Sequence, residues 1–515
     1  MAPNYKDLIA GAGFSGITLA LMLEQAKIDY EVFESSSGVS PLGSAVVLGP
    51  TIMPLLEQLG LLERVQKISN PVKTLHLVKE NLKRIGEINL AEHTKQTGYS
   101  SMVTTRSDFL SLLISQIPSH KIHFSKRIIS STANKDEVVI RCADDTSYKG
   151  EILVGADGAF SKIRALLYKQ VAKKGILPRN DALALAANNA VLAATASTSE
   201  KESIDYSALV EGGDMFHGGH MSVVGVTQPL DVELFPMLQE TESRCDTVIS
   251  DSTPYSWSYF TVPGNRICWA VNIQQDENTL REQQQERSRT PRSSPSPPPS
   301  FSSLSSYSSA TSAEPRPSSD SEWESHHSSN TAHPLGKPLD LEDCRSFKIS
   351  YDKTLGDLID ATPRDQIARA VTEQTLFETW HHGRTVLIGD ACHRMVSNAA
   401  HQGTVNAMLD AVVLGNLIHD LPSASPRNLV EIFKEFQSNR YSHAKAQMQM
   451  NNKVGKWMSS QSWTEALMRK FVVRYISRIY QHFCDDRILA DRPQANFMPQ
   501  VTSRGSVHAP PQGLH

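Results

Sequence analysis

The sequence has few cysteines and no long hydrophobic segment. Its six cysteines contain no CxxC pair and no regular spacing, which argues against a disulfide framework and against a zinc site. No run of 18 uninterrupted apolar residues occurs, so no membrane-spanning helix is expected. The first predicted strand begins close to Met1 and leaves no room for a signal peptide, so we expect a cytoplasmic protein.

The sequence also has no excess of positively charged residues. The 51 lysines and arginines against 55 aspartates and glutamates give a net charge of -4, which offers no reason to expect a nucleic acid partner. Hydrophobic residues make up 40% of the chain and charged residues 21%, as is typical of globular proteins. A chain of 515 residues is too long for one hydrophobic core, so two or three domains are expected.

The most informative motif that is present is glycine-rich and lies near the N-terminus. Residues 8–16 read Leu-Ile-Ala-Gly-Ala-Gly-Phe-Ser-Gly, an apolar strand that runs into GxGxxG and then into an apolar helix pattern. Gly11 permits the tight turn after the strand, Gly13 lets the backbone approach a diphosphate, and Gly16 lets the helix pack closely on the sheet. The amides at the helix N-terminus favour the diphosphate charge. The motif therefore predicts a dinucleotide-binding βαβ unit.

Acidic residues stand at the carboxyl ends of three predicted apolar strands. They are Glu34, Asp157 and Asp390. In open α/β sheets, ligands bind at this edge. Glu34 ends the second strand of the βαβ unit, where a carboxylate can accept hydrogen bonds from the ribose hydroxyls of adenosine.

GxGxxG, Asp157-Gly158 and Gly389-Asp390, in this order and at about these distances, resemble the single-component FAD-dependent aromatic hydroxylases of the p-hydroxybenzoate hydroxylase type, particularly fungal members. The resemblance covers roughly residues 5–65, 100–170 and 350–420. It implies an α/β fold. Its parts would be a Rossmann-type FAD-binding domain of the glutathione reductase kind, a substrate domain built on an antiparallel β-sheet, and C-terminal helices.

The expected domain organisation has four segments. They are the first segment of the FAD-binding domain, the substrate domain, the second FAD-binding segment, and the C-terminal helices with a tail, at residues 1–170, 171–380, 381–425 and 426–515. Short β segments with turn signals at 205–275 predict the antiparallel sheet. The serine- and proline-rich stretch 282–335 predicts a disordered insertion, because it has too little apolar surface to bury.

The resemblance assigns roles to the residues around the adenosine half of FAD. The three glycines of the motif would surround the diphosphate, and Glu34 would bind the ribose. Arg106, at the predicted start of a helix, would pair with the diphosphate, for which a planar guanidinium is well suited. A predicted loop at residues 45–48, above all Val47, would pass near the flavin through its backbone.

Further roles concern the flavin half. Asp157 would serve both FAD and the transient contact with NADPH, and Arg164 would lie close to that path. Asp390 would form a hydrogen bond with the ribityl chain. Gly403 would begin a helix whose amides and dipole stabilise negative charge on the reduced flavin.

The sequence departs from the family pattern after Gly-Asp-Ala-Cys-His. The family usually has a proline there and then Gly-Gln-Gly, whereas this chain has Ser397 at the proline position and His401 in place of the first glycine, with one extra residue. The change predicts an altered flavin geometry and leaves room for weakened activity. Asn406 and Asp410 still fit the helix that follows, and His393 is interpreted as structural rather than as a catalytic base.

The activity implied by the resemblance is that of an FAD-dependent monooxygenase. NADPH (or NADH) would bind transiently and reduce FAD, and O2 would then form a C4a-hydroperoxyflavin. This species would deliver one oxygen atom to a hydrophobic or aromatic small molecule, by hydroxylation or epoxidation, in secondary metabolism. No separate NADPH fingerprint occurs, and no side chain is assigned a catalytic role. Tyr255, Trp257 and Tyr259 share one face of a predicted strand, and they either line the substrate pocket or join the core.

Two other functions remain open: a flavin-dependent dehydrogenase or oxidase on the same fold, and a degenerate, non-catalytic FAD-binding protein. No metal site is expected, because His217-Gly-Gly-His220 resembles a turn and the pair His381-His382 has no carboxylate or cysteine at ligand spacing. The basic amphipathic stretch 456–480 is either an ordinary packed helix or a peripheral contact with an internal membrane.

Overall fold

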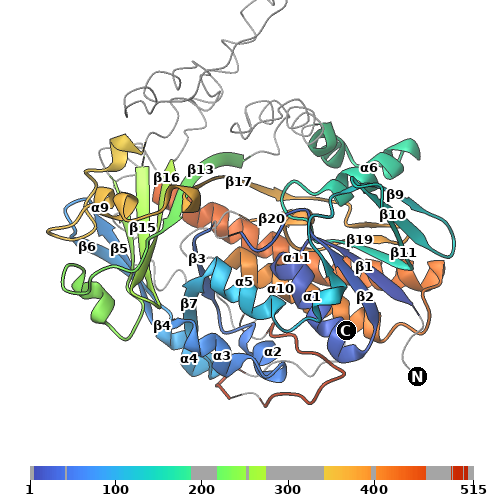
Figure 1. Cartoon of the computed structure of the whole chain (residues 1–515), viewed down its shortest axis with the longest axis horizontal. Coiled ribbons are helices and arrows are strands. Elements are labelled where there is room, and N and C mark those ends of the chain that lie inside the picture. The colour runs from blue at the N-terminus through green and yellow to red at the C-terminus, as the bar shows by residue number, and fades with distance from the viewer. Residues whose placement is uncertain are drawn as a thin grey trace, which may run out of the picture. The chain divides into compact units, whose positions relative to one another are not determined.

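A six-stranded sheet holds the predicted βαβ unit (Figure 1), in the strand order β18–β19–β12–β1–β2–β8. Its strands are β1 (Lys6–Ala10), β2 (Asp29–Phe33), β8 (Ile122–His123), β12 (Ile152–Gly155), β18 (His381–His382) and β19 (Thr385–Leu387). All neighbours pair in parallel except β18, which runs antiparallel to β19. Parallel strands are covered on both faces, which explains why β12 and the end of β1, from Leu8 onward, read as apolar runs. The predicted α/β fold is confirmed.

The computed structural model describes residues 5–40, 43–186, 217–250, 255–273, 341–395, 402–459, 489, 491–502 and 504–507. Three expectations lie outside these residues: the insertion at 282–335, the departure at Ser397 and His401, and the basic stretch beyond residue 459. All described residues belong to one compact unit, Met1–Gln275 with Leu339–His515. Within the described part of the chain, no helix combines the length and the apolar character that crossing a membrane requires.

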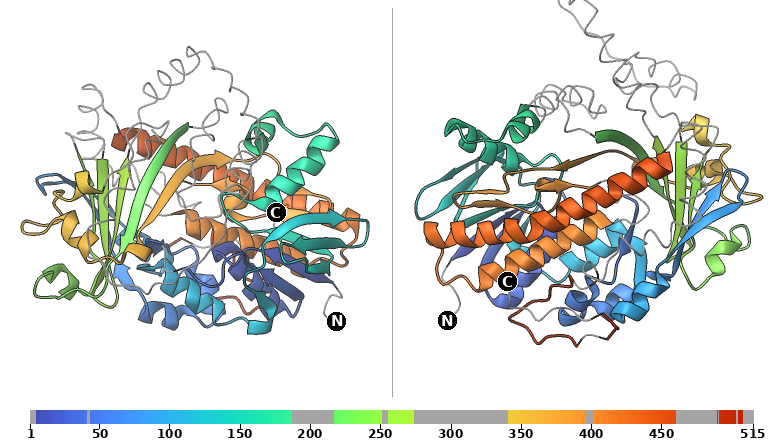
Figure 2. Two further views of the ribbon diagram at one scale, coloured as in Figure 1. Left: turned by 45° about the horizontal axis from the view of Figure 1, so that its top comes forward. Right: turned by 180° about the vertical axis from the view of Figure 1, so that it is seen from behind.

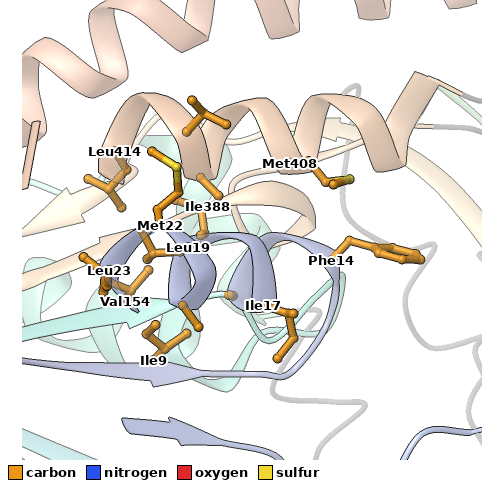
Figure 3. Close-up of a cluster of buried hydrophobic side chains, with 14 of the residues drawn as sticks. Ile9, Phe14, Ile17, Leu19, Met22, Leu23, Val154, Ile388, Met408 and Leu414 are labelled. Atoms are coloured by element: carbon orange, nitrogen blue, oxygen red, sulfur yellow. The ribbon is translucent and has the colours of Figure 1, made fainter. Parts of the chain in front are cut away.

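Two helices from opposite ends of the sequence pack together on this sheet. Figure 3 shows α1 (Phe14–Ala26) between the strands and α10 (Gln402–His419), with Met22 of α1 close to Leu414 of α10. Residues 14–23 of α1 are all buried, as expected for a helix that is covered on all sides over most of its length. Gly415 keeps the two helices close, because a Cβ there would lie 3.1 Å from the Cβ of Met22. The C-terminal part of the chain thus completes the N-terminal unit.

A long helix, α11 (Pro426–Ser459), runs beside α10 (Figure 2). Phe433, Phe436, Arg440 and Ala444 are all buried and recur at helical spacing, so they form the packed face of α11. The C-terminal helices that the resemblance implied therefore begin with α11.

A smaller antiparallel sheet corrects the expectation for residues 45–48. This segment is not a loop but a strand, β3 (Ala45–Leu48), which pairs with β7 (Ser101–Thr105); β7 also pairs with β4 (Asn70–Val72). The flanking glycines and proline suggested a loop. The strand was missed because its hydrogen-bonding partners lie far along the sequence and leave no local pattern. The helical segments around this sheet are α2 (Met53–Gln58), α3 (Leu62–Lys67), α4 (Ala91–Thr97) and α5 (Arg106–Ile114).

Another antiparallel sheet and one helix complete the nucleotide-binding side. The sheet consists of β9 (Ile128–Ala133), β10 (Val138–Cys142) and β11 (Ser147–Gly150). Its buried residues Ile128, Val138 and Ile140 share the core of the six-stranded sheet. The helix α6 (Lys162–Lys173) begins shortly after β12 and carries three lysines.

An eight-stranded sheet matches the predicted antiparallel sheet with one exception. In the order β20–β17–β13–β16–β15–β14–β5–β6, only β14 and β5 pair in parallel. The strands are β5 (Thr74–Lys79), β6 (Arg84–Asn89), β13 (His217–Val226), β14 (Cys245–Ile249), β15 (Tyr255–Val262), β16 (Arg266–Ile273), β17 (Ala368–Leu376) and β20 (His393–Arg394). The sheet therefore includes strands from residues 74–89, long before its main part. The predicted turn at His217–His220 is wrong: these residues lie in β13, at a register shift against β17.

One face of β15 packs into the core rather than lining an open pocket. Trp257 and Tyr259 are both 1% exposed. The Trp257 ring stacks on Phe347 with centroids 4.3 Å apart, and its Nε1 donates to the Lys348 carbonyl at 3.0 Å. Residues 341–367, which include α9 (Leu355–Asp360), cover this face. Of the two interpretations of the aromatic residues on β15, the structure supports the core for these two side chains.

Candidate functional site

A cleft of about 410 Å³ lies at the carboxyl ends of β1, β2 and β12. Five of the predicted residues line it, from four separate segments of the chain: Gly11, Gly13, Glu34, Arg106 and Asp157. Apolar residues that the sequence reasoning missed form part of its wall, namely Leu110, Ile114 and Phe124. No sequence motif marks these three, because they belong to an ordinary amphipathic helix and to a loop after a two-residue strand.

The three glycines of the motif differ in how much room a side chain would have at each position. Gly11 has a φ of +104°, and a Cβ there would lie 2.4 Å from the Ala156 carbonyl oxygen, so the turn accepts only glycine. At Gly16 a Cβ would lie 2.0 Å from the Gly11 carbonyl oxygen. At Gly13 a Cβ would meet nothing within 4 Å. The first and third glycines therefore close the turn, while the second leaves the backbone open to the cleft.

Glu34 is tied to this turn by hydrogen bonds. Its Oε2 accepts from the Ala12 amide at 2.9 Å, and its Oε1 accepts from the Ser36 amide and hydroxyl, each at 2.8 Å. Burial raises the pKa of this carboxyl group, but the hydrogen bonds from Ser36 and Ala12 outweigh burial and hold the pKa below its usual value. Glu34 is therefore an ionised acceptor at the end of β2, as a ribose-binding carboxylate requires.

Arg106 begins α5 on the other side of the cleft. Its guanidinium carbon lies 5.6 Å from the centre of the Phe14 ring, and a Cβ at Gly43 would lie 3.0 Å from its Cδ. Burial lowers the pKa of Arg106, while the charges of Glu34 and Asp390 raise it. Among the described residues no carboxylate lies within ion-pair distance of this guanidinium. A partly buried cation of this kind favours an anionic ligand.

Asp157 lines the cleft, but its carboxylate accepts hydrogen bonds at the N-terminus of α6. Its Oδ1 accepts from the Ser161 hydroxyl at 2.5 Å, and its Oδ2 accepts from the amides of Lys162 and Ile163 at 2.7 and 3.0 Å. Burial raises the pKa of Asp157 despite these hydrogen bonds. The carboxylate thus fixes the loop between β12 and α6.

Arg164 was expected near the path of NADPH. In the structure its side chain is buried and forms hydrogen bonds with two loops. Its side chain is 2% exposed, and it donates to the carbonyls of Ala159 at 2.7 Å and of Ala391 at 2.9 Å. Its guanidinium carbon lies 4.1 Å from the centre of the Phe377 ring. Arg164 therefore couples the loop after β12 to the loop after β19.

The loop after β19 turns at Gly389, which has a φ of +62°. A Cβ at Gly389 would lie 2.9 Å from the Ser15 hydroxyl and 3.1 Å from the Cβ of Ala407, so the turn fits between α1 and α10. The next residue, Asp390, is exposed, and its charge acts on Arg106. Asp390 thus faces open space near the cleft, although it is not among the residues that line it.

Two other predicted residues lie outside the lining of the cleft. The side chain of Val47 is 5% exposed and packs in the core between β3 and the eight-stranded sheet, with Phe260 in the same cluster. Its side chain is therefore enclosed by the core, and the expected contact of its backbone with the flavin stays a prediction. Gly403 lies in the first turn of α10, where a Cβ would be 3.8 Å from Met395.

A buried charge network, which no sequence motif indicated, fixes α10 behind the Gly389 turn. Asp410 Oδ2 accepts from the Gly389 amide at 3.0 Å and pairs with His393 Nε2 at 2.6 Å. Its Oδ1 accepts from Arg440 Nε of α11 at 2.7 Å. Burial raises the pKa of Asp410, but the charges of His393 and Arg440 outweigh it and lower the pKa to about 2. His393 is therefore structural, as its pairing with Asp410 requires.

Cys392, His393 and Asp410 are close enough together to suggest a metal site. The Cys392 thiol donates instead to the Gly389 carbonyl at 3.2 Å, and burial raises its pKa well above the usual range. Both oxygens of Asp410 are occupied by hydrogen bonds within the network. The cluster is therefore better described as a neutralised ion pair than as a ligand set.

A family model described as an FAD binding domain matches residues 4–243. The FAD-dependent monooxygenase nvfK of Aspergillus novofumigatus is 23% identical over 521 residues, which cover 99% of this chain and 92% of nvfK. Klebsiella pneumoniae HpxO complexed with FAD and uric acid has a TM-score of 0.64 at 16% identity, over 95% of this chain and 98% of HpxO. A salicylate hydroxylase substrate complex has a TM-score of 0.58 at 15% identity, over 97% and 100%. The two solved structures show that this chain shares their fold.

Proposed function

We propose a reaction for this chain on one premise: it is an FAD-dependent monooxygenase of the p-hydroxybenzoate hydroxylase type. In this reaction NADPH or NADH would reduce bound FAD, and O2 would supply one oxygen atom to a hydrophobic or aromatic small molecule. The carrying observation is the convergence of a glycine turn, an ionised Glu34 and a cationic Arg106 on one cleft. These groups fit the diphosphate and the ribose of FAD.

The residues that would hold FAD divide into two groups. Gly11, Gly13, Glu34 and Arg106 would hold the adenosine and diphosphate half. Asp390 would accept a hydrogen bond from the ribityl chain, while the backbone at Val47 and Gly403 would approach the flavin. Support comes from the proximity of Asp390 to Arg106, which links the turn after β19 to the cleft.

When bound, FAD would supply the redox chemistry that links oxidation of the nicotinamide to activation of O2. The chain's own contribution is position and charge. Asp157 and Arg164 fix the loop after β12, and Asp410 fixes the turn before Asp390 through the Gly389 amide. Because these contacts are formed within the protein, they hold the loop after β12 and the turn before Asp390 in place without a contribution from the cofactor.

A substrate screen tests the proposal. The purified protein, loaded with FAD, is mixed with NADPH or NADH and with phenolic, polyketide and isoprenoid compounds, and the products are analysed by mass spectrometry. The expected result is faster consumption of the reduced nucleotide with one compound class, together with a product heavier by one oxygen atom. Hydrogen peroxide without an oxygenated product would favour the oxidase alternative. FAD-loaded protein that neither consumes the reduced nucleotide nor forms a product with any compound would favour the non-catalytic FAD-binding protein.

A further inference from the structure

A cluster of three cations at the rim of the cleft has no role in the holding of FAD described above. Arg127 and Lys162 both line the cleft, on the side of the loop after β12. Lys169 lies seven residues after Lys162 on α6, so the two side chains share one face of the helix. Arg127 and Lys169 are exposed, whereas Lys162 is partly buried. We call Arg127, Lys162 and Lys169 the rim patch.

The charges of the rim patch are uncompensated. Burial lowers the pKa of Lys162, and the positive charges of Lys169 and Arg127 lower it further. In the described part of the chain, none of these three side chains has a carboxylate within ion-pair distance. The neighbouring Lys126 differs, because it forms an ion pair with Asp144. Three clustered, unpaired cations on a chain of net charge -4 therefore create a local positive field.

The backbone amides at the N-terminus of α6 do not add an anion-binding site to this positive field. Asp157 already accepts hydrogen bonds from the amides of Lys162 and Ile163, so the helix N-terminus has its own anionic partner. What remains for a ligand is the side-chain charge of the rim patch. The diphosphate of FAD has separate donors at Gly13 and Arg106, and the adenosine of FAD carries no further phosphate.

We propose that the rim patch binds the phosphates of the nicotinamide dinucleotide, in particular a 2′-phosphate, and so selects NADPH over NADH. This inference rests on the proposed function, which requires a visiting nicotinamide dinucleotide. The chemistry fits in two respects. A phosphate dianion is attracted by clustered cations, and the planar guanidinium of Arg127 can contact it with two hydrogen bonds. The chain offers no second glycine fingerprint for this nucleotide, so surface charge supplies the recognition.

Equilibrium dialysis of NADP+ and NAD+ against the FAD-loaded protein tests the rim patch without turnover. The variant K162E/K169E reverses two of its charges, and K67E/K83E reverses two exposed lysines on α3 and beside β6 as a matched control. We expect NADP+ to bind about tenfold more weakly to K162E/K169E, with less than about a threefold change for NAD+. The control should remain within about twofold for both nucleotides. Added salt should weaken NADP+ binding to the wild-type protein more than to K162E/K169E.

A milder variant, Arg127→Gln, keeps the test valid if the double variant folds poorly, and FAD content and thermal unfolding report folding for each protein. Equal loss of NADP+ and NAD+ binding, or unchanged NADP+ binding in folded variants, would overturn the proposal. So would a loss of FAD affinity without a loss of NADP+ affinity, because the patch would then serve FAD. The proposed function fails on a different result, the absence of an oxygenated product, which this dialysis does not measure.

Discussion

Gly13 and Gly16 lie in one turn of the chain, but their surroundings differ. A Cβ at Gly13 would meet nothing within 4 Å, whereas a Cβ at Gly16 would collide with the Gly11 carbonyl oxygen at 2.0 Å. We therefore expect Gly13→Ala to fold like the wild-type protein and to lose FAD affinity by about tenfold or more, because its methyl group enters the space of the diphosphate. Fluorescence titration with FAD measures the affinity.

The matched variant Gly16→Ala should instead lower the stability of the protein even without FAD, because the helix must move away from the turn. The expected loss is about 1–3 kcal/mol, as for overpacked sites in protein cores. Thermal unfolding of the two FAD-free variants separates the cases. If Gly13→Ala is destabilised as strongly as Gly16→Ala, the open space at Gly13 has been misjudged.

Asp7 is a buried acid on β1 whose carboxylate has no polar partner among the residues that the structure describes. It is fully buried, and neither carboxylate oxygen has a hydrogen bond in the described structure. Burial, and then the charges of Glu151 and Asp29, raise the pKa of Asp7 well above its usual value. The folded state therefore holds this proton more tightly than the unfolded state, so the contribution of Asp7 to stability falls as the pH rises above the unfolded pKa of about 4.

Asp7→Asn should consequently stabilise the protein at neutral pH. The gain is expected to reach about 1.4 kcal/mol for each pH unit above about 4 over which the folded carboxyl group stays protonated. Unfolding experiments at pH 5 and pH 7 measure the difference, which should be larger at pH 7. The exposed acid Glu233→Gln serves as a control and should change the unfolding free energy by less than about 0.5 kcal/mol at both pH values. A gain at pH 5 that equals the gain at pH 7 would contradict the assignment.

Residue by residue, the sequence predicts groups whose role depends on local spacing. Gly11, Gly13 and Glu34 belong to one βαβ unit, so the fold of that unit is enough to bring the three residues close together. The hydrogen bonds of Asp157 with α6 could not be predicted in the same way, because the motif does not reveal where a carboxylate points. The apolar wall residue Phe124 follows a strand of two residues, which is too short to leave a pattern.

At the scale of elements, α10 and α11 are joined through Asp410 and Arg440. Asp410 is fully buried and also holds the Gly389 amide. Asp410→Asn should destabilise the protein by about 3 kcal/mol, because Arg440 then keeps a buried charge with one partner fewer. FAD affinity should fall as well, since the turn before Asp390 loses its anchor. Thermal unfolding and FAD titration measure the two effects.

The exposed pair Arg427–Glu431 on α11 provides the control. Glu431→Gln should change the unfolding free energy by less than about 0.5 kcal/mol. In the wild-type protein, the depressed pKa of Asp410 stabilises the fold above about pH 4, and this contribution is lost as the pH falls toward about 2. Asp410→Asn should remove that part of the acid sensitivity. An effect of Asp410→Asn no larger than that of Glu431→Gln would show that the network contributes little.

Long, periodic elements were predicted well, and short strands with distant partners were not. The helices α1, α10 and α11 are legible in the sequence because their apolar patterns extend over many residues. The four residues of β3 were interpreted as a loop, since their strand character depends on pairing of Val47 with Val103. The parallel pairing of β14 with β5 could not be predicted for the same reason. It joins segments about 170 residues apart, as the pairing of Cys245 with Leu75 shows.

On the scale of the whole molecule, the C-terminal segment 491–507 crosses several elements. Arg492 is buried and donates to the carbonyls of Thr97, at 3.1 Å, and of Val507. Gln58 of α2 exchanges hydrogen bonds with the backbone of Ala495. Arg492→Ala should lower the unfolding free energy by about 1–3 kcal/mol, because buried carbonyls lose their donor.

Limited proteolysis checks this expectation together with thermal unfolding. Cleavage within 491–507 should be faster in Arg492→Ala than in the wild-type protein, because the segment then opens at a lower free-energy cost. The exposed Arg179→Ala serves as a control and should change neither quantity. Equal cleavage rates in all three proteins would show that Arg492 does not hold the segment in place.

The strand order of the parallel sheet has a consequence for synthesis on the ribosome. Asp7 of β1 pairs with Ile152 of β12, and Leu153 of β12 pairs with Thr385 of β19. The nascent chain therefore carries an open, apolar sheet edge until β19 has emerged, long after the glycine turn is made. Such an edge invites chaperone binding and misassembly during translation. We expect the cofactor to be captured only at the end of synthesis, since the turn at Gly389 and the helix α10 complete its site.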